Sequence, residues 1–181
     1  MPPLFSQPVG TLAMKSISIV TACYNEEENV EELYNRVRDV MVKLDRYRYE
    51  HIFIDNCSQD GTVKILKRIA ASDTNVKLIV NARNFGHIRS PQHALYQTTG
   101  DAVIGLVADL QDPPEMIPDF IREWENGYAM VLAVKRKRHP PSSQSVSPSF
   151  VASSQRSCSS IGTPFLRHCL MLPPCEDRLA V

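Results

Sequence analysis

The most informative segment of this sequence is Val103-Ile104-Gly105-Leu106-Val107-Ala108-Asp109-Leu110-Gln111-Asp112-Pro113-Pro114-Glu115. Its apolar run predicts a buried strand, and the two prolines after the polar residues predict a rigid loop. Ligands of an open α/β sheet bind beyond the carboxyl ends of the strands, so Asp109, Gln111 and Asp112 lie where a site is expected. Their oxygens suit a hard cation, Mg²⁺ or Mn²⁺, better than zinc. The same residues are also common caps of turns and helices, and this segment leaves both interpretations open.

The rest of the chain repeats the pattern of a strand followed by an amphipathic helix. Apolar, β-branched runs predict further strands at Ile17–Cys23, Tyr49–Asp55, Val76–Val80 and Tyr128–Val134. Helical spacing predicts helices over Glu26–Leu44, Val63–Ala70, Pro91–Thr98 and Met116–Trp124, with Asn25 and Ser90 as N-caps and Gly127 as the last stop. This alternation predicts an α/β fold with a mostly parallel central sheet flanked by helices.

Composition narrows the classes of function. Lys+Arg and Asp+Glu both number 20, so the zero net charge argues against a nucleic-acid partner. The five cysteines have no disulfide or zinc spacing, which favours a reducing, cytoplasmic location. No apolar run approaches the ~20 residues of a membrane span, and the N-terminus does not have the pattern of a signal peptide.

Both ends of the chain differ in character from its middle. Residues 1–14 are expected to form a flexible lead-in, and 15–138 the folded domain. From 139 to 181, Ser, Pro, Cys, Gln and Arg prevail and no structural period persists, which predicts a disordered tail. Our hypothesis is that this tail is the product of a truncated or frame-shifted reading frame.

Polar side chains follow three of the predicted strands. They are Tyr24 and Glu26, then Asp55 and Asp60, then Asp109 and Gln111. The carboxyl ends of parallel strands meet at one edge of the sheet, so these groups are expected to converge on one site. Each also has a local structural explanation: Glu26 fits a helix start, and Asp55 and Asp60 fit strand-end turns.

Four motifs, in this order, resemble those of family 2 glycosyltransferases, and the branch that uses polyisoprenyl or dolichol phosphates in particular. The resemblance covers about Ile17 to Lys137. The motifs are Thr21-Ala22-Cys23-Tyr24-Asn25-Glu26-Glu27-Glu28-Asn29, Ile54-Asp55-Asn56-Cys57-Ser58-Gln59-Asp60-Gly61-Thr62, Arg83-Asn84-Phe85-Gly86, and Ala108 to Glu115. The resemblance implies a GT-A fold with a Rossmann-like sheet. It also implies inverting transfer of a sugar from a UDP- or GDP-linked donor, with a polyprenyl phosphate at a membrane surface as a possible acceptor.

The resemblance also implies roles for individual residues. Tyr24, Glu26, Asp55 and Asp60 would contact the nucleotide sugar, with Asp55 as the base-recognising acid. Asp109 would be the catalytic, metal-holding acid beside Gln111, and Mg²⁺ or Mn²⁺ would neutralise the diphosphate. Arg83 and the basic run 135–138 would hold phosphates, although basic runs are more often simply solvated.

This chain departs from the family pattern at several positions. Val107 replaces the first acid of Asp-x-Asp, Ala22 stands where proline is frequent, and Asn56-Cys57 replaces Asp-Gly. The acceptor-binding half and membrane helices of this branch are also not found after Arg138. A glycosyltransferase is therefore the first prediction, and a noncatalytic nucleotide-sugar-binding or interaction module is the alternative. A nucleotidyltransferase is disfavoured, because no glycine-rich, lysine-containing phosphate loop precedes the first helix.

Overall fold

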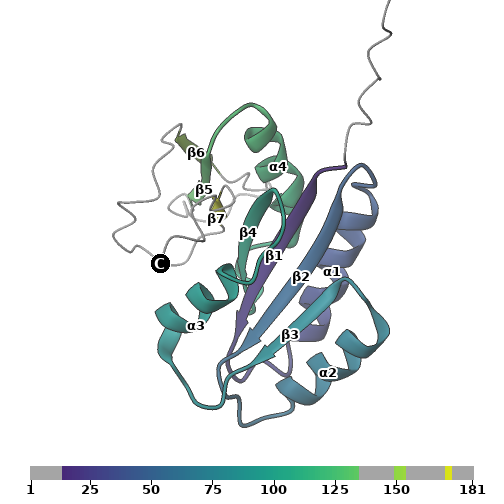
Figure 1. The fold of residues 1–181 in the computed structure, drawn as a ribbon, viewed down its shortest axis with the longest axis vertical. Coiled ribbons are helices and arrows are strands. Elements are labelled where there is room, and N and C mark those ends of the chain that lie inside the picture. The colour runs from purple at the N-terminus through teal and green to yellow at the C-terminus, as the bar shows by residue number, and fades with distance from the viewer. Residues whose placement is uncertain (1–13, 135–148, 154–169, 173–181) are drawn as a thin grey trace, which may run out of the picture.

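The computed structural model describes residues 14–134, 149–153 and 170–172 (Figure 1). The strands are β1 (Ser16–Cys23), β2 (Arg48–Asp55), β3 (Val76–Val80), β4 (Ala102–Val107), β5 (Met130–Val134), β6 (Ser149–Ser153) and β7 (Leu170–Leu172). The helices are α1 (Val30–Val42), α2 (Thr62–Ser72), α3 (Gly86–Leu95), the 3-10 helix η1 (Pro114–Met116) and α4 (Ile117–Glu125). Strands and helices alternate as the sequence predicts, and the predicted strands are present.

The strands form one mostly parallel sheet in the order β3-β2-β1-β4-β7-β5-β6. The pairs β1–β2, β1–β4 and β2–β3 are parallel. Since β7 is antiparallel to both β4 and β5, strand β5 runs parallel to β4, and β6 is antiparallel to β5. Cys23 pairs with Asp55, and Ala22 pairs with Val107, so β1, β2 and β4 end side by side.

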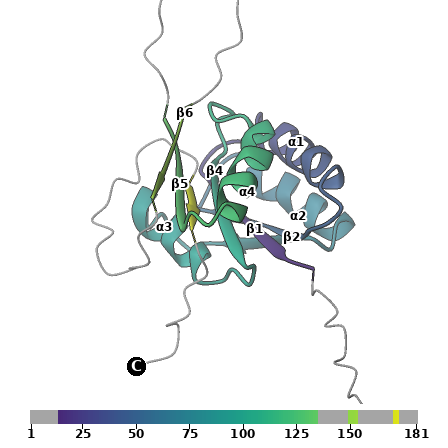
Figure 2. The ribbon, with the colours of Figure 1, turned by 90° about the horizontal axis from the view of Figure 1, so that it is seen from above.

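Helices cover both faces of the sheet. The main core lies between one face and α1, α2 and α4, where residues such as Ile19, Phe53 and Phe120 are fully buried. On the other face, α3 packs through Ala94 against a smaller cluster that includes Val20 of β1 (Figure 2). This two-sided cover explains why the central strands read as nearly continuous apolar runs.

Two predicted helix starts are wrong. Asn25 does not cap α1: its backbone is left-handed, with φ of 54°, and the helix begins at Val30 after a turn whose N–H groups bond to the Glu26 carbonyl. Helix α3 begins at Gly86, not at Ser90-Pro91, so Pro91 lies inside the helix. Gly86, at φ of 84°, turns the chain into the helix while its N–H bonds to Asn84 Oδ1. Gly127, at φ of 95°, ends α4 as predicted.

Two short strands lie in the segment that was expected to be without regular structure. Strands β6 and β7 add to the sheet beside β5, although they belong to the 139–181 tail. Strand β6 pairs with β5 at the edge of the sheet, and β7 lies between β4 and β5, both by antiparallel pairing. The remainder of the predicted tail, the basic run 135–138 and residues 1–13 lie outside the described residues. In the described part of the chain, no helix is long and apolar enough to cross a membrane.

Candidate functional site

Left-handed backbone marks the carboxyl edge of the sheet. Among the described residues, the non-glycine residues with positive φ are Asn25, Cys57 and Leu110. They follow β1, β2 and β4 respectively, which are neighbours in the sheet. The left-handed conformation costs roughly 1–2 kcal/mol for such residues, and residues that adopt it are often clustered at functional sites. This edge is therefore the candidate site.

The loop after β2 is built around the buried carboxylate of Asp55. Asp55 Oδ2 accepts hydrogen bonds from the backbone N–H groups of Cys57 and Ser58, both at 3.0 Å, and Oδ1 accepts one from the Ser58 hydroxyl. These bonds hold Cys57 in its left-handed conformation. Asp55 thus orients the backbone of the loop as well as lying at the strand end.

The loops after β1 and β2 are hydrogen-bonded to each other. Ser58 Oγ accepts from the Asn25 backbone N–H at 2.9 Å, and Asn25 Oδ1 accepts from the Gln59 N–H at 2.8 Å. One turn further, the Glu26 N–H donates to Thr62 Oγ1 at 2.8 Å. These contacts join the first two predicted motifs into a single polar surface.

The Asp60 side chain adds a further hydrogen bond between the loops after β1 and β2. Its Oδ2 accepts from the Glu27 N–H at 3.1 Å, and its Oδ1 accepts from both the N–H and the hydroxyl of Thr62. Burial opposes ionisation of Asp60, but the bonds from Thr62 and Glu27 outweigh it and lower the pKa of the carboxyl. Glu27 reciprocates by accepting from the Gly61 N–H. Asp60 is therefore an anion with a structural role in both loops.

Asn56 connects the loop after β2 to the loop after β3. Its Nδ2 donates to Asn84 Oδ1 at 2.9 Å, and its Oδ1 accepts from the Phe85 N–H at 2.9 Å and from Asn81 Nδ2 at 3.3 Å. Asparagine supplies both a donor and an acceptor here, which the aspartate expected from the family pattern does not when ionised. Arg83 lies exposed in the third loop, with its guanidinium 4.9 Å from the centre of the Phe85 ring.

The loop after β4 presents Asp109 and Gln111, both exposed. Asp109 Oδ1 accepts from the Gln111 N–H at 3.1 Å, which closes a tight turn around Leu110. Val107, at the strand end, is 37% exposed. In the described residues no group of three or more His, Cys, Asp or Glu side chains could hold a metal ion. Protein oxygens from Asp109 and Gln111 would fit a hard cation only if a ligand supplied further oxygens.

The sheet edge thus gathers the predicted site residues on adjacent loops. Tyr24 is exposed at the end of β1, and Glu26, Asp55 and Asp60 take part in the shared hydrogen bonds. Sequence reasoning missed the bridging roles of several side chains, because their partners are distant in the chain. They are Glu27, Asn56 and Ser58.

Cys23 lies beneath this edge and is buried. Burial, and then the negative charges of Asp55 and Glu26, raise the pKa of its thiol. A thiol held in this state is a poor nucleophile. Cys23 is therefore a core residue and not a reactive group of the site.

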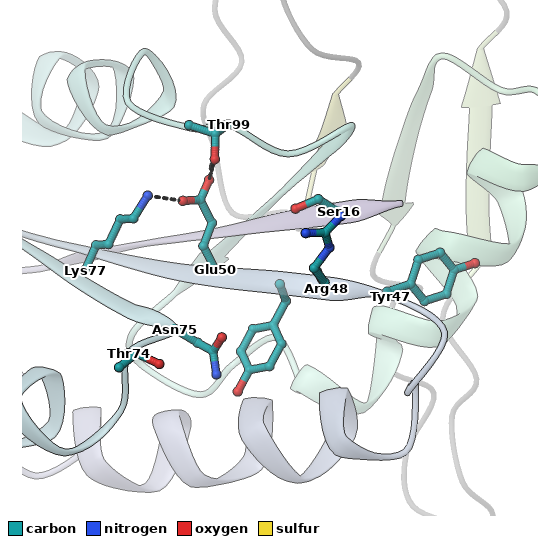
Figure 3. Close-up of a pocket in the computed structure, with 9 residues that line it drawn as sticks. Ser16, Tyr47, Arg48, Glu50, Thr74, Asn75, Lys77 and Thr99 are labelled. Atoms are coloured by element: carbon teal, nitrogen blue, oxygen red, sulfur yellow. Dashed lines mark hydrogen bonds and ion pairs between the residues drawn. The ribbon is translucent and has the colours of Figure 1, made fainter. Parts of the chain in front are cut away.

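The opposite, amino-terminal edge of the sheet carries a hollow of about 440 Å³ (Figure 3). Its polar centre is Glu50, whose carboxylate accepts bonds from Ser18, Lys77 and Thr99. Burial opposes ionisation of Glu50, but these bonds outweigh it and lower its pKa. Because the carboxylate is satisfied by the protein, this network explains the packing of the loop before β4 without a ligand.

Known proteins are similar to this chain over the region that contains the sheet and its loops. The family model described as glycosyl transferase family 2 matches residues 18–165. The chain is 42% identical over 122 residues to a bactoprenol glucosyl transferase of Shigella phage SfX, which is 67% of this chain and 40% of the relative. It is 38% identical over 123 residues to an undecaprenyl-phosphate 4-deoxy-4-formamido-L-arabinose transferase of Pseudomonas fluorescens, 67% of this chain and 36% of that protein. The chain thus spans well under half the length of these relatives.

Solved structures confirm the predicted fold class. The mannosyltransferase PcManGT of Pyrobaculum calidifontis, solved with GDP-Man and Mn²⁺, aligns with a TM-score of 0.56 at 23% identity, over 66% of this chain and 35% of that one. S. aureus TarS, residues 1–349, aligns with a TM-score of 0.53 at 21% identity, over 64% and 34%. The sheet with its polar carboxyl edge is therefore a GT-A fold, and the chain belongs to glycosyl transferase family 2.

Proposed function

We propose that this chain forms the donor-binding part of a glycosyltransferase that moves a sugar, with inversion, from a UDP- or GDP-linked donor to a polyprenyl phosphate. The observation that carries this proposal is the carboxyl edge of the sheet, where the loops after β1, β2 and β4 each contain a left-handed residue and hydrogen bonds hold the first two loops together. Two relatives are named as transferases of bactoprenol and of undecaprenyl phosphate, and these names support a polyprenyl phosphate as the acceptor.

The nucleotide would bind across the loops after β1 and β2. Tyr24 offers an exposed aromatic ring, and the loop shaped by Asp55 offers polar backbone groups beside it. Glu26 and Asp60 would keep the two loops in register, since their backbone or side chains bond across them. Arg83, exposed in the next loop, is placed to attract phosphate oxygens.

A divalent cation, Mg²⁺ or Mn²⁺, would bind between the diphosphate and the loop after β4. Asp109 would supply a carboxylate and Gln111 an amide oxygen, and the diphosphate would supply the remaining ligands. When bound, such an ion neutralises the charge that develops on the leaving diphosphate. The acceptor phosphate is already an anion, so the protein needs no dedicated general base to activate it. Asp109 is the residue on which this chemistry depends most.

Isothermal calorimetry with UDP-glucose and GDP-mannose at several Mn²⁺ concentrations tests this proposal. We expect one donor to bind in the presence of metal, and Asp109→Ala to weaken that binding by about tenfold or more, the loss of one charged ligand. Asp39→Ala, at an exposed position on α1, is the matched control and should leave binding unchanged. The proposal fails if neither donor binds, or if Asp109→Ala and Asp39→Ala behave alike.

The second candidate is a noncatalytic nucleotide-sugar-binding module, favoured by the apolar Val107 at a position where the family pattern has an acid. Binding alone does not separate the two candidates. Transfer of radiolabelled sugar from the bound donor to a polyprenyl phosphate would support the enzyme. Donor binding without transfer, with donor and acceptor both saturating, would support the module.

A further inference from the structure

The outward face of α3 carries an unusual set of exposed side chains. At spacings of three and four residues, this α3 stripe consists of Phe85, Ile88, Arg89, Gln92, His93 and Tyr96. Phe85 is 41% exposed, Ile88 39% and Tyr96 58%, although large apolar and aromatic side chains are normally turned inward. The opposite side of the helix, with Ser90 and Ala94, is buried against the sheet. The helix therefore packs one side against the sheet and also carries large apolar groups on its solvent-exposed side.

The charge of this region has one sign. Residues 81–100 contain Arg83, Arg89, His87 and His93 but no Asp or Glu, in a chain that has 20 acidic residues in 181. The Arg83 guanidinium lies over the Phe85 ring, so cation and aromatic group form one unit at the start of the stripe. A hollow of about 280 Å³ opens beside Phe85, Arg89 and His93. Such a surface attracts an anion and also offers apolar contact.

We propose that the α3 stripe binds the surface of an anionic lipid bilayer. The stripe combines apolar and aromatic side chains with an arginine, which suits the boundary between headgroups and acyl chains, where Phe, Ile and Tyr enter and Arg reaches phosphate. A partner protein helix would call for a continuous apolar surface, whereas polar side chains separate Ile88 from Tyr96 along this stripe. The exposed Arg89 would reach a lipid phosphate, while the hollow beside it adds apolar surface for contact with acyl chains.

The α3 stripe adjoins the candidate donor site, and none of its six residues is among those assigned to donor binding. The Phe85 N–H bonds to Asn56 of the loop after β2, so the stripe begins next to the carboxyl edge of the sheet. A bilayer bound there would bring lipid phosphates toward that edge. Lipid binding as proposed requires no nucleotide, so it can fail or succeed independently of the proposed function.

Sedimentation of the full 181-residue chain with vesicles tests the proposal. We expect binding to vesicles of equal phosphatidylglycerol and phosphatidylcholine, weakening as salt is raised, and little binding to pure phosphatidylcholine. Arg89→Gln should reduce partitioning about fivefold, the effect of one basic group near an anionic surface. Ile88→Ser should reduce it about tenfold through lost apolar contact.

Matched controls lie on the helices of the other sheet face. Lys67→Gln on α2 removes an exposed cation, and Val42→Ser on α1 removes an exposed apolar group, and both should keep partitioning within about twofold of wild type. Circular dichroism establishes that each variant is folded. Equal loss in the controls, or equal binding to neutral vesicles, would overturn the proposal. It would also be overturned by a lipid-free dimer that Ile88→Ser dissociates, because the stripe would then belong to a second copy of the chain.

Discussion

Acidification should destabilise this protein through one buried imidazole. His51 lies inside the sheet core, with Nε2 2.9 Å from Thr21 Oγ1 and with no hydrogen-bond partner for Nδ1. Its ring is tilted against that of Phe53, with centroids 4.0 Å apart. Burial lowers the pKa of His51 to about 3, and the charge of Asp73 offsets only part of this effect. The folded protein therefore keeps His51 neutral where an unfolded chain would protonate it.

The sign and size of the effect follow from linkage. The unfolded histidine binds a proton below its ordinary pKa near 6.5, whereas the folded one does not until about 3. Between these values the unfolded state binds more protons, so the free energy of unfolding falls as pH falls. Going from pH 7.5 to pH 5.0, the loss due to His51 comes to about 2 kcal/mol. This is a large part of a typical stability of about 5–15 kcal/mol.

Urea unfolding at pH 7.5 and pH 5.0, followed by fluorescence of the single tryptophan, Trp124, measures this loss. His51→Leu removes the titrating group, so its loss between the two pH values should be smaller than that of wild type by about 2 kcal/mol. Any constant cost of the substitution cancels, because each variant is compared with itself. His87→Gln, at an exposed position, is the control and should keep the wild-type difference. Equal losses in wild type and His51→Leu would refute the reasoning.

Two further substitutions test the candidate site. Val107→Asp adds a carboxylate at the end of β4 and should tighten Mn²⁺-dependent donor binding roughly tenfold in calorimetry, because the charge of the ligands sets the affinity for hard cations. The control Val107→Asn adds no charge and should give a much smaller gain. Equal gains in the two variants would contradict the metal assignment. Cys57→Gly should be about 1 kcal/mol more stable than Cys57→Ala in urea unfolding, because glycine adopts a φ of 68° without the steric cost that the Cβ of alanine carries. Equal stability would mean that the loop relaxes out of the left-handed conformation.

The strands were predictable because each carries its own signal. Runs such as Val76–Val80 are apolar and β-branched, and the observed strand has the predicted bounds. The parallel pairing of β1, β2, β3 and β4 also followed from the alternation with helices, because parallel strands need crossover connections. What local pattern could not supply was the antiparallel addition of β7 between β4 and β5, since that pairing depends on a strand far along the chain.

Helix starts and loop roles were harder to predict, because they depend on distant partners. Asn25 has the composition of an N-cap, yet its side chain bonds to Gln59, 34 residues away, and the helix starts later. Ser90-Pro91 reads as a helix start, but Ser90 is buried and accepts from Asn81 Nδ2. Sequence reasoning did place Asp55 at the end of β2 and Asp109 just after β4, because both positions follow directly from the apolar runs before them.

The hydrogen bonds divide the site edge into two units. The turns at Asn25 and Cys57 share Ser58, which accepts from the first loop and donates to Asp55 of the second. The turn at Leu110 closes on itself, through Asp109 and the Gln111 N–H. A substitution at Val107 should therefore act on the loop that would hold the metal, while the paired loops after β1 and β2 keep their shape. Under this division, Val107→Asp strengthens donor binding only when Mn²⁺ is present, because without the ion the added carboxylate repels the diphosphate.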